Sequence, residues 1–162
     1  MGSRARHDRP RRRDLRRMIL IAGLTLTLDQ ASKWFFRTTF TPGKSLPLLP
    51  ILHLTYVENT GAAFGLFPGQ HLVFIGMSIA VIGWIIWEMA AGPVQDAWLF
   101  WGCSLILGGA AGNLIDRLRF GHVIDFIDLR VWPVFNLADS AITIGVGLIV
   151  WRALAERRRG ST

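Results

Sequence analysis

Charged residues are concentrated at the two ends of this chain of 162 residues, and the long stretch between the ends is apolar. Residues 1–17 hold eight Arg and two Asp, and residues 152–162 hold four Arg and one Glu. The 134 residues between these tails carry only 14 charged side chains. An apolar body with basic ends is typical of a membrane protein, whose tails contact anionic lipid rather than nucleic acid. The pattern excludes a disordered chain, a disulfide scaffold and an ordinary soluble enzyme.

Four segments are long and apolar enough to be transmembrane helices, for which about 20 residues are needed. They are residues 18–36, 69–87, 97–115 and 137–151. Together they predict one membrane domain, residues 18–153, between a basic tail of residues 1–17 and a second tail of residues 154–162. The predicted fold class is an all-α membrane protein with four transmembrane helices.

An even number of spans puts both termini on the same side of the membrane. Cytoplasmic segments carry an excess of Lys and Arg, so the basic tails predict that both termini are cytoplasmic. The short connector of residues 88–96 should lie on the same side, and it departs from this rule because it has no Lys or Arg. The two larger connectors, residues 37–68 and 116–136, are then exported.

The exported connectors contain signals for structure of their own. Residues 41–44, Thr-Pro-Gly-Lys, predict a turn, and the β-branched and aromatic side chains of residues 51–57 predict a strand. Open strand edges cannot face lipid, so we expect a small β-sheet at the exported surface. We expect residues 120–134 to form a short amphipathic loop or helix over the site.

Small residues recur on one face of the third helix. Ser104, Gly108 and Gly112 follow one another at intervals of four residues. Such faces let helix backbones approach closely in a membrane, so we interpret this one as a packing surface.

Acidic residues inside or beside apolar segments are the first candidates for a functional site. A carboxylate in a bilayer must face protein, water or a partner, because lipid makes its charge costly. A rise of about 1.5 Å per helical residue places the acids of the first and fourth helices near the exported end. The third helix and the loop after it contribute two more at the same level. The four converging carboxylates are Asp29, Asp116, Asp125 and Asp139.

Two of these acids have a basic neighbour. Lys33 follows Asp29 by four residues, which is about one helical turn, and Arg117 adjoins Asp116. We expect both acids to form ion pairs that hold helix ends in place. Asn113 precedes Asp116 by three residues, so it lies on the same face of the helix.

The other two acids, Asp125 and Asp139, have no adjacent basic residue. Two carboxylates brought together share one proton, which is the arrangement of an aspartic protease. One acid withdraws a proton from water, and the other donates to the carbonyl oxygen and later to the leaving amine. A purely structural alternative remains open, in which Asp125 forms a turn and Asp139 caps a helix.

Other catalytic chemistries lack their sequence signals. The four His residues are scattered, and the chain has neither an H-E-x-x-H zinc motif nor a G-x-S-x-G nucleophile motif. A small proton- or cation-coupled membrane carrier is the alternative function, because acids within spans also serve transporters. The gathering of the acids at one end and the lack of inverted repeats favour the peptidase.

Five short blocks carry a resemblance to a known family. They are Asp29-Gln30-Ala31-Ser32-Lys33, Asn59-Thr60-Gly61-Ala62-Ala63-Phe64, Gly112-Asn113-Leu114-Ile115-Asp116-Arg117, Val123-Ile124-Asp125-Phe126 and Phe135-Asn136-Leu137-Ala138-Asp139-Ser140. In these blocks the chain resembles the lipoprotein signal peptidases, also called signal peptidase II. The resemblance extends from about residue 18 to residue 153 and leaves out the Arg-rich head.

The resemblance implies an endopeptidase that removes the signal peptide from bacterial prolipoproteins, just before a cysteine that bears a diacylglyceryl group. It implies that Asp125 and Asp139 are the catalytic pair and that no metal or cofactor is needed. Asn113 and Asn136 match family positions that hydrogen-bond this pair. Further positions that shape the site are matched by Asp29, Lys33, Asn59, Asp116 and Arg117.

The resemblance also implies a location and partners. The enzyme would lie in the bacterial inner membrane, surrounded by membrane lipids, with its site near the exported surface. Cyclic peptide antibiotics that occupy the catalytic site are a further class of partner. Gly61 either lets the substrate chain approach closely or forms an ordinary turn, and the sequence leaves both readings open.

Overall fold

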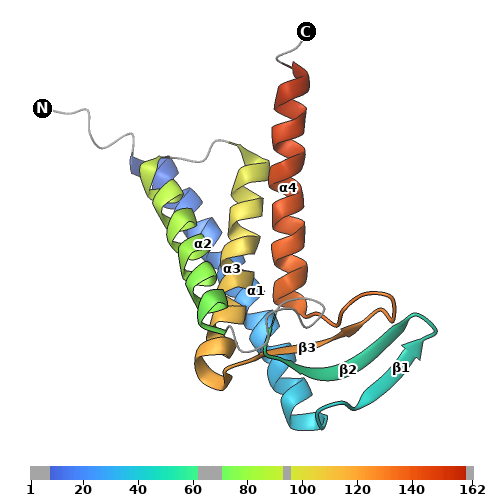
Figure 1. Ribbon diagram of the computed structural model, residues 1–162. Coiled ribbons are helices and arrows are strands. Elements are labelled where there is room, and N and C mark those ends of the chain that lie inside the picture. Colours follow the sequence, from blue (N-terminus) through green and yellow to red (C-terminus); the bar gives the residue numbers. More distant parts are fainter. Residues whose placement is uncertain (1–7, 62–70, 93–95, 160–162) are drawn as a thin grey trace, which may run out of the picture.

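The structure, a computed structural model, describes residues 8–61, 71–92 and 96–159. Its elements, in chain order, are α1 (Asp8–Thr39), β1 (Ser45–Leu49), β2 (Leu52–Asn59), α2 (His71–Ala91), α3 (Ala97–Phe120), β3 (Val123–Asp128) and α4 (Leu137–Arg159). The helices run alternately in opposite directions (Figure 1). The start of α1 and the end of α4 therefore lie at one end of the bundle, and the sheet lies at the other end.

All four predicted helices are present in the described part of the chain. Among the described residues, three helices are long and apolar enough to cross a membrane, with candidate spans at Leu72–Met89, Ala97–Phe120 and Leu137–Arg158. Helix α1 has 32 residues, but polar side chains in its second half, among them Asp29 and Lys33, lower its hydropathy. Its role as a fourth span therefore stays a prediction.

Two predicted features fall partly outside the described residues. The second predicted helix was placed from residue 69, and the structure describes it from His71. Within the block of residues 59–64, only residues 59–61 are described.

Helix α3 is the central element, because α1, α2 and α4 all pack against it. A Cβ atom added to Gly108 would lie 2.6 Å from the carbonyl oxygen of Ala22 in α1. One added to Gly112 would collide with the carboxylate of Asp29. The predicted packing role of these two glycines is confirmed, since only a residue without a side chain fits so close to α1.

The predicted sheet is confirmed and has three antiparallel strands in the order β1-β2-β3. The expectation of a loop or helix over the site is wrong for Val123–Asp128, which forms β3. Its residues pair with β2, with Val57 opposite Asp125. The strand is favoured because it satisfies the edge of β2 and buries almost all of its own side chains.

An aromatic cluster attaches the sheet to the end of α1. Phe36 of α1 stacks on Phe126 of β3 with ring centroids 4.3 Å apart. Tyr56 and Ile124 complete this core, and each is at most 2% exposed. The cluster holds β3 beside the helix ends, and so fixes Asp125 relative to the bundle.

Close packing at Gly108 makes a testable prediction. The Gly108→Ala variant should lose about 1–3 kcal/mol of unfolding free energy, because the new methyl group meets backbone atoms of α1 that cannot turn away. Thermal unfolding in detergent measures this loss. Gly83→Ala is the matched control, because nothing lies within 4 Å of its added Cβ. Equal melting temperatures for the two variants would contradict the packing argument.

Candidate active site

Asp125 and Asp139 lie on different elements and line the same cavity, which has a volume of about 260 Å³. Asp125 is in the middle of β3, and Asp139 is in the first turn of α4. The cavity is lined by Asn59, Gly61, Asn113, Arg117, Val123, Asp125, Trp132, Pro133, Val134, Phe135, Asp139 and Thr143. The predicted pair therefore lines one cavity from two different elements.

The local structure around Asp139 is a capping box at the start of α4. The Asp139 amide donates to Asn136 Oδ1 at 2.9 Å, and the Asn136 amide donates to Asp139 Oδ2 at 3.3 Å. Asn136 is the N-cap, so the structural alternative that gave this role to Asp139 is wrong. The alternative for Asp125 is wrong as well, because this residue lies in a strand and not in a turn.

Asparagine amides hold both carboxylates. Asp125 is 1% exposed and accepts hydrogen bonds from Asn59 Nδ2 at 2.8 Å and Asn136 Nδ2 at 2.7 Å. Asp139 Oδ1 accepts from Asn113 Nδ2 at 2.7 Å. Asn136 Nδ2 also lies 3.2 Å from Asn113 Oδ1, so one network connects the two acids. The amides fix both carboxylates by donating to them without adding a charge.

The pKa of Asp125 is raised to about 7, mainly by burial and to a lesser degree by the nearby charge of Asp139. Hydrogen bonds from Asn59 and Asn136 oppose the rise, because they favour the charged form. Asp125 therefore keeps its proton between the ordinary Asp pKa of 3.8 and about 7, where an ordinary Asp is ionised. A carboxylic acid of this kind can donate a proton near neutral pH.

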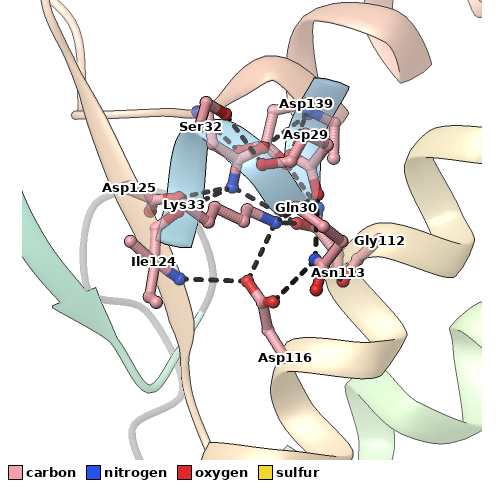
Figure 2. Close-up of polar contacts among 12 residues, drawn as sticks. Asp29, Gln30, Ser32, Lys33, Gly112, Asn113, Asp116, Ile124, Asp125 and Asp139 are labelled. Atoms are coloured by element: carbon pink, nitrogen blue, oxygen red, sulfur yellow. Dashed lines mark hydrogen bonds and ion pairs between the residues drawn. The ribbon is translucent and has the colours of Figure 1, made fainter. Parts of the chain in front are cut away.

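Behind the pair lies a buried cluster centred on Lys33, which is 2% exposed (Figure 2). Its ammonium group lies 2.9 Å from Asp29 Oδ2, 2.9 Å from Asp116 Oδ2 and 2.8 Å from Asn113 Oδ1. The predicted pairing of Asp29 with Lys33 is confirmed. For Asp116 the structure differs from the prediction, because its ion pair is with Lys33 and not with the adjacent Arg117.

The side chain of Arg117 extends away from Asp116, toward the catalytic cavity and helix α2. Its guanidinium lies 5.1 Å from the ring centre of Phe74 in α2 and donates to the carbonyl oxygen of Asn113 at 3.5 Å. Asp116 is buried and faces α1, where Lys33 is already desolvated. Asp116 therefore pairs with the buried Lys33 and not with Arg117, its neighbour in the sequence.

The two acids of the cluster each hold one of the elements that carry the catalytic candidates. Asp29 Oδ1 accepts from the Ala138 amide at 2.9 Å, in the first turn of α4. Asp116 Oδ2 accepts from the Ile124 amide at 3.3 Å, in β3 beside Asp125. The buried cluster thus sets the position of both backbones.

One member of this cluster, Gln30, was not predicted as a site residue from the sequence. Gln30 Nε2 lies 3.2 Å from Asp29 Oδ2, 3.2 Å from the Gly112 carbonyl oxygen and 2.9 Å from Asp116 Oδ1. Its place between Asp29 and Lys33 in one sequence block was the available signal. Gly61 is buried, and its amide donates to Asn59 Oδ1 at 3.0 Å, which turns the other end of that amide toward Asp125.

Comparisons with known proteins show that the sequence and fold are similar to those of bacterial membrane enzymes. The family model described as signal peptidase (SPase) II matches residues 21–155. The lipoprotein signal peptidase of Moorella thermoacetica is 50% identical over 137 residues, which cover 84% of this chain and 91% of that protein. The lipoprotein signal peptidase of Pelotomaculum thermopropionicum is 39% identical, with 89% and 95% covered.

Two solved structures of bacterial membrane enzymes have the same fold as this chain. A bacterial membrane enzyme determined by the in meso method at 2.3 Å matches with a TM-score of 0.81 and 34% identity, over 86% of this chain and 88% of that one. A second, at 1.9 Å, matches with a TM-score of 0.74 and 36% identity, over 85% and 92%. The class is therefore a helical membrane protease. The chain belongs to the signal peptidase II family, and it removes signal peptides from prolipoproteins. This assignment favours the peptidase over the carrier hypothesis.

The buried cluster predicts a large effect of removing its cation. The Lys33→Met variant should lose about 3–5 kcal/mol of unfolding free energy, because two buried carboxylates then lack a counter-charge. Thermal unfolding in detergent measures the loss, with the exposed Lys44→Met as control. Adding Asp29→Asn and Asp116→Asn to Lys33→Met should restore part of the stability. No restoration would contradict an electrostatic cause.

The raised pKa of Asp125 predicts a dependence of stability on pH. The protonated Asp125 side chain is compatible with its buried position, and the charged form is not. Its contribution to the free energy of unfolding is therefore greatest below the ordinary pKa of 3.8 and is lost as pH rises through about 7. Asp125→Asn lacks this loss, so its melting temperature relative to the parent should rise between pH 4.5 and pH 8, values chosen on either side of about 7. A constant difference in melting temperature between Asp125→Asn and the parent across this pH range would show that the pKa of Asp125 is not raised.

Proposed function

We propose that the enzyme is an aspartic endopeptidase, in which Asp125 and Asp139 activate water to cut a diacylglyceryl-modified prolipoprotein just before its lipidated cysteine. The observation that carries the proposal is the shared cavity, into which β3 and α4 each contribute one acid. Both acids are held by amide donors, so their free lone pairs are available to water and to the peptide.

The chemistry follows from the different surroundings of the two acids. Asp125, whose pKa is raised, holds the shared proton, and Asp139 is the carboxylate that takes a proton from water. The water oxygen then bonds to the peptide carbonyl carbon as Asp125 donates its proton to the carbonyl oxygen. Collapse of the tetrahedral intermediate breaks the C–N bond. One hydroxyl of the intermediate returns a proton to Asp125, and the leaving amine receives the proton taken by Asp139, not a second one from Asp125 as expected from the sequence.

This mechanism assigns supporting roles to the other predicted residues. Asn59, Asn113 and Asn136 hold the acids, and the charge of Arg117 at the cavity wall favours their single shared negative charge. Among the described residues, no group of three His, Cys, Asp or Glu is placed to hold a metal ion. The lack of a metal requirement stays a prediction of the aspartic mechanism.

We infer a membrane topology of four spans, with α1 as the additional one. Asp29 and Lys33 of α1 face protein, since they are 0% and 2% exposed, whereas Leu20 and Leu24 of the same helix are exposed and suited to lipid. The Arg-rich ends of α1 and α4 lie at the same end of the bundle, which favours a cytoplasmic location for both termini. The acids then lie near the exported surface of the bacterial inner membrane.

A site at that level suits a lipidated substrate. The acyl chains keep the cysteine in the bilayer, so the peptide bond beside it stays near the headgroups and reaches the acids by lateral diffusion. Membrane lipids are therefore partners as well as solvent. We also propose that cyclic peptide antibiotics occupy the catalytic cavity and compete with the substrate.

The proposed mechanism predicts that each acid is required. Asp125→Asn and Asp139→Asn should lower cleavage of a diacylglyceryl-modified peptide by about 10²–10⁴-fold or more, because each removes one half of the acid–base pair. Purified protein and mass detection of the products measure the rate. An unlipidated twin of the peptide tests whether the lipid is needed.

Asp128→Asn is the matched control, because Asp128 lies in the same strand but bonds to Thr55 and Arg130, away from the catalytic cavity. It should retain cleavage. Activity in either Asp125→Asn or Asp139→Asn close to that of the Asp128→Asn control would refute the dyad.

A further inference from the structure

A second cavity, of about 140 Å³, lies between the ends of α1 and α3 and the start of β3. Among the residues described, it shares no lining residue with the catalytic cavity. Lys33 and Asp116 form its inner wall, so it lies on the far side of the buried cluster from the two catalytic acids. The lining residues are Gln30, Lys33, Trp34, Arg37, Asp116, Arg119, Phe120 and Ile124.

Two arginines converge at the mouth of this cavity. The guanidinium of Arg37 lies 4.0 Å from the ring centre of Phe120, and that of Arg119 lies 5.3 Å from the same ring. Stacking on one ring holds two like charges close together. In the described part of the chain, neither arginine has a carboxylate within ion-pair distance.

The acid inside the cavity does not compensate this charge. The Oδ1 atom of Asp116 accepts from Gln30, and its Oδ2 atom is within 2.9 Å of the ammonium group of Lys33. The cavity therefore has three cations in its wall against one carboxylate that is already engaged. Two guanidinium forks with free donors are the groups that proteins use to bind phosphate.

The surroundings of the cavity indicate the rest of the ligand. Trp34, in the cavity wall, is 68% exposed, and Leu118 on the neighbouring helix is 64% exposed. Arg37 and Arg119 are in the last turns of α1 and α3, where a membrane helix meets the headgroups. A ligand here meets positive charge at one end and apolar surface at the other.

We propose that this cavity binds the phosphate headgroup of an anionic phospholipid, between Arg37 and Arg119, with an acyl chain passing over Trp34. The proposal goes beyond the peptidase function and needs only that α3 spans the bilayer, whichever leaflet its end faces. Occupancy links α1, α3 and β3, because Ile124 of β3 lines the same cavity. The bound lipid should therefore stabilise the fold.

The test is thermal unfolding of the full-length protein in a neutral detergent, with phosphatidylglycerol titrated into the micelles. The melting temperature of the parent should rise and saturate. The double variant Arg37→Gln/Arg119→Gln should need about tenfold more lipid, or more, for the same rise, because both phosphate contacts are lost. Lys44→Gln/Arg130→Gln is the matched control, since it removes two cations beside the ends of β1 and β3, outside the cavity.

Separate arms of the experiment test the identity of the ligand. Phosphatidylcholine should give a smaller rise, because its headgroup has no net charge, and inorganic phosphate should give little, because it has no acyl chain. An equal response to either probe would overturn the assignment to an anionic lipid. An equal response of the two double variants to phosphatidylglycerol would overturn the site.

A second variant covers the case in which Arg37→Gln/Arg119→Gln does not fold. Arg37→Lys/Arg119→Lys keeps both charges but lacks the planar fork, so its response should saturate at several-fold higher lipid than that of the parent. An unchanged response would overturn the proposed contacts. These readouts do not depend on cleavage, so failure of the lipid site and failure of the dyad can be told apart.

Discussion

The rest of the structure depends on the burial of one lysine between two carboxylates and an amide. Removing Lys33 from water is costly, and two ion pairs and a hydrogen bond at 2.8–2.9 Å offset the cost. The two carboxylates use their remaining acceptor capacity on backbone amides of other elements, those of Ala138 in α4 and Ile124 in β3. An arrangement of this kind contributes positional accuracy more than stability, because three separate elements must meet at fixed distances for every charge to be satisfied.

Lys33 also sets the orientation of the side-chain amides of Asn113 and Asn136. Its ammonium group can only donate, so Asn113 must present its oxygen to Lys33 and its nitrogen to Asp139. The oxygen of Asn113 also accepts from Asn136, whose nitrogen reaches Asp125 as well. A single buried cation thus orients Asn113 and Asn136, the two amides that connect the acids. The charge thus lies at the centre of the cluster, and neutral donors contact the two acids at its edge.

Local patterns in the sequence predicted the parts of the site that depend on nearby residues. The four helices, the Asp29–Lys33 pair and the four acids follow from hydropathy, from the spacing of helical turns and from the cost of charge in lipid. Strand β3 was missed because its partner, β2, lies more than 60 residues earlier in the chain. The pairing of Asp116 with Lys33 was missed for the same reason, since 83 residues separate them. Contacts that only the tertiary fold creates leave no periodic signal.

Helix α1 shows why hydropathy is weakest where the chemistry lies. The residues that make it too polar for a clear membrane span include Asp29, Gln30 and Lys33, the ones that build the buried cluster. They face α3 and α4 and not the bilayer around the bundle, and the exposed face of the helix is mostly apolar. A mean hydropathy taken along the apolar segment of the helix mixes these two faces. In an enzyme that works inside a membrane, the helix with the poorest average hydropathy is therefore a good place to look for the groups that position its catalytic residues.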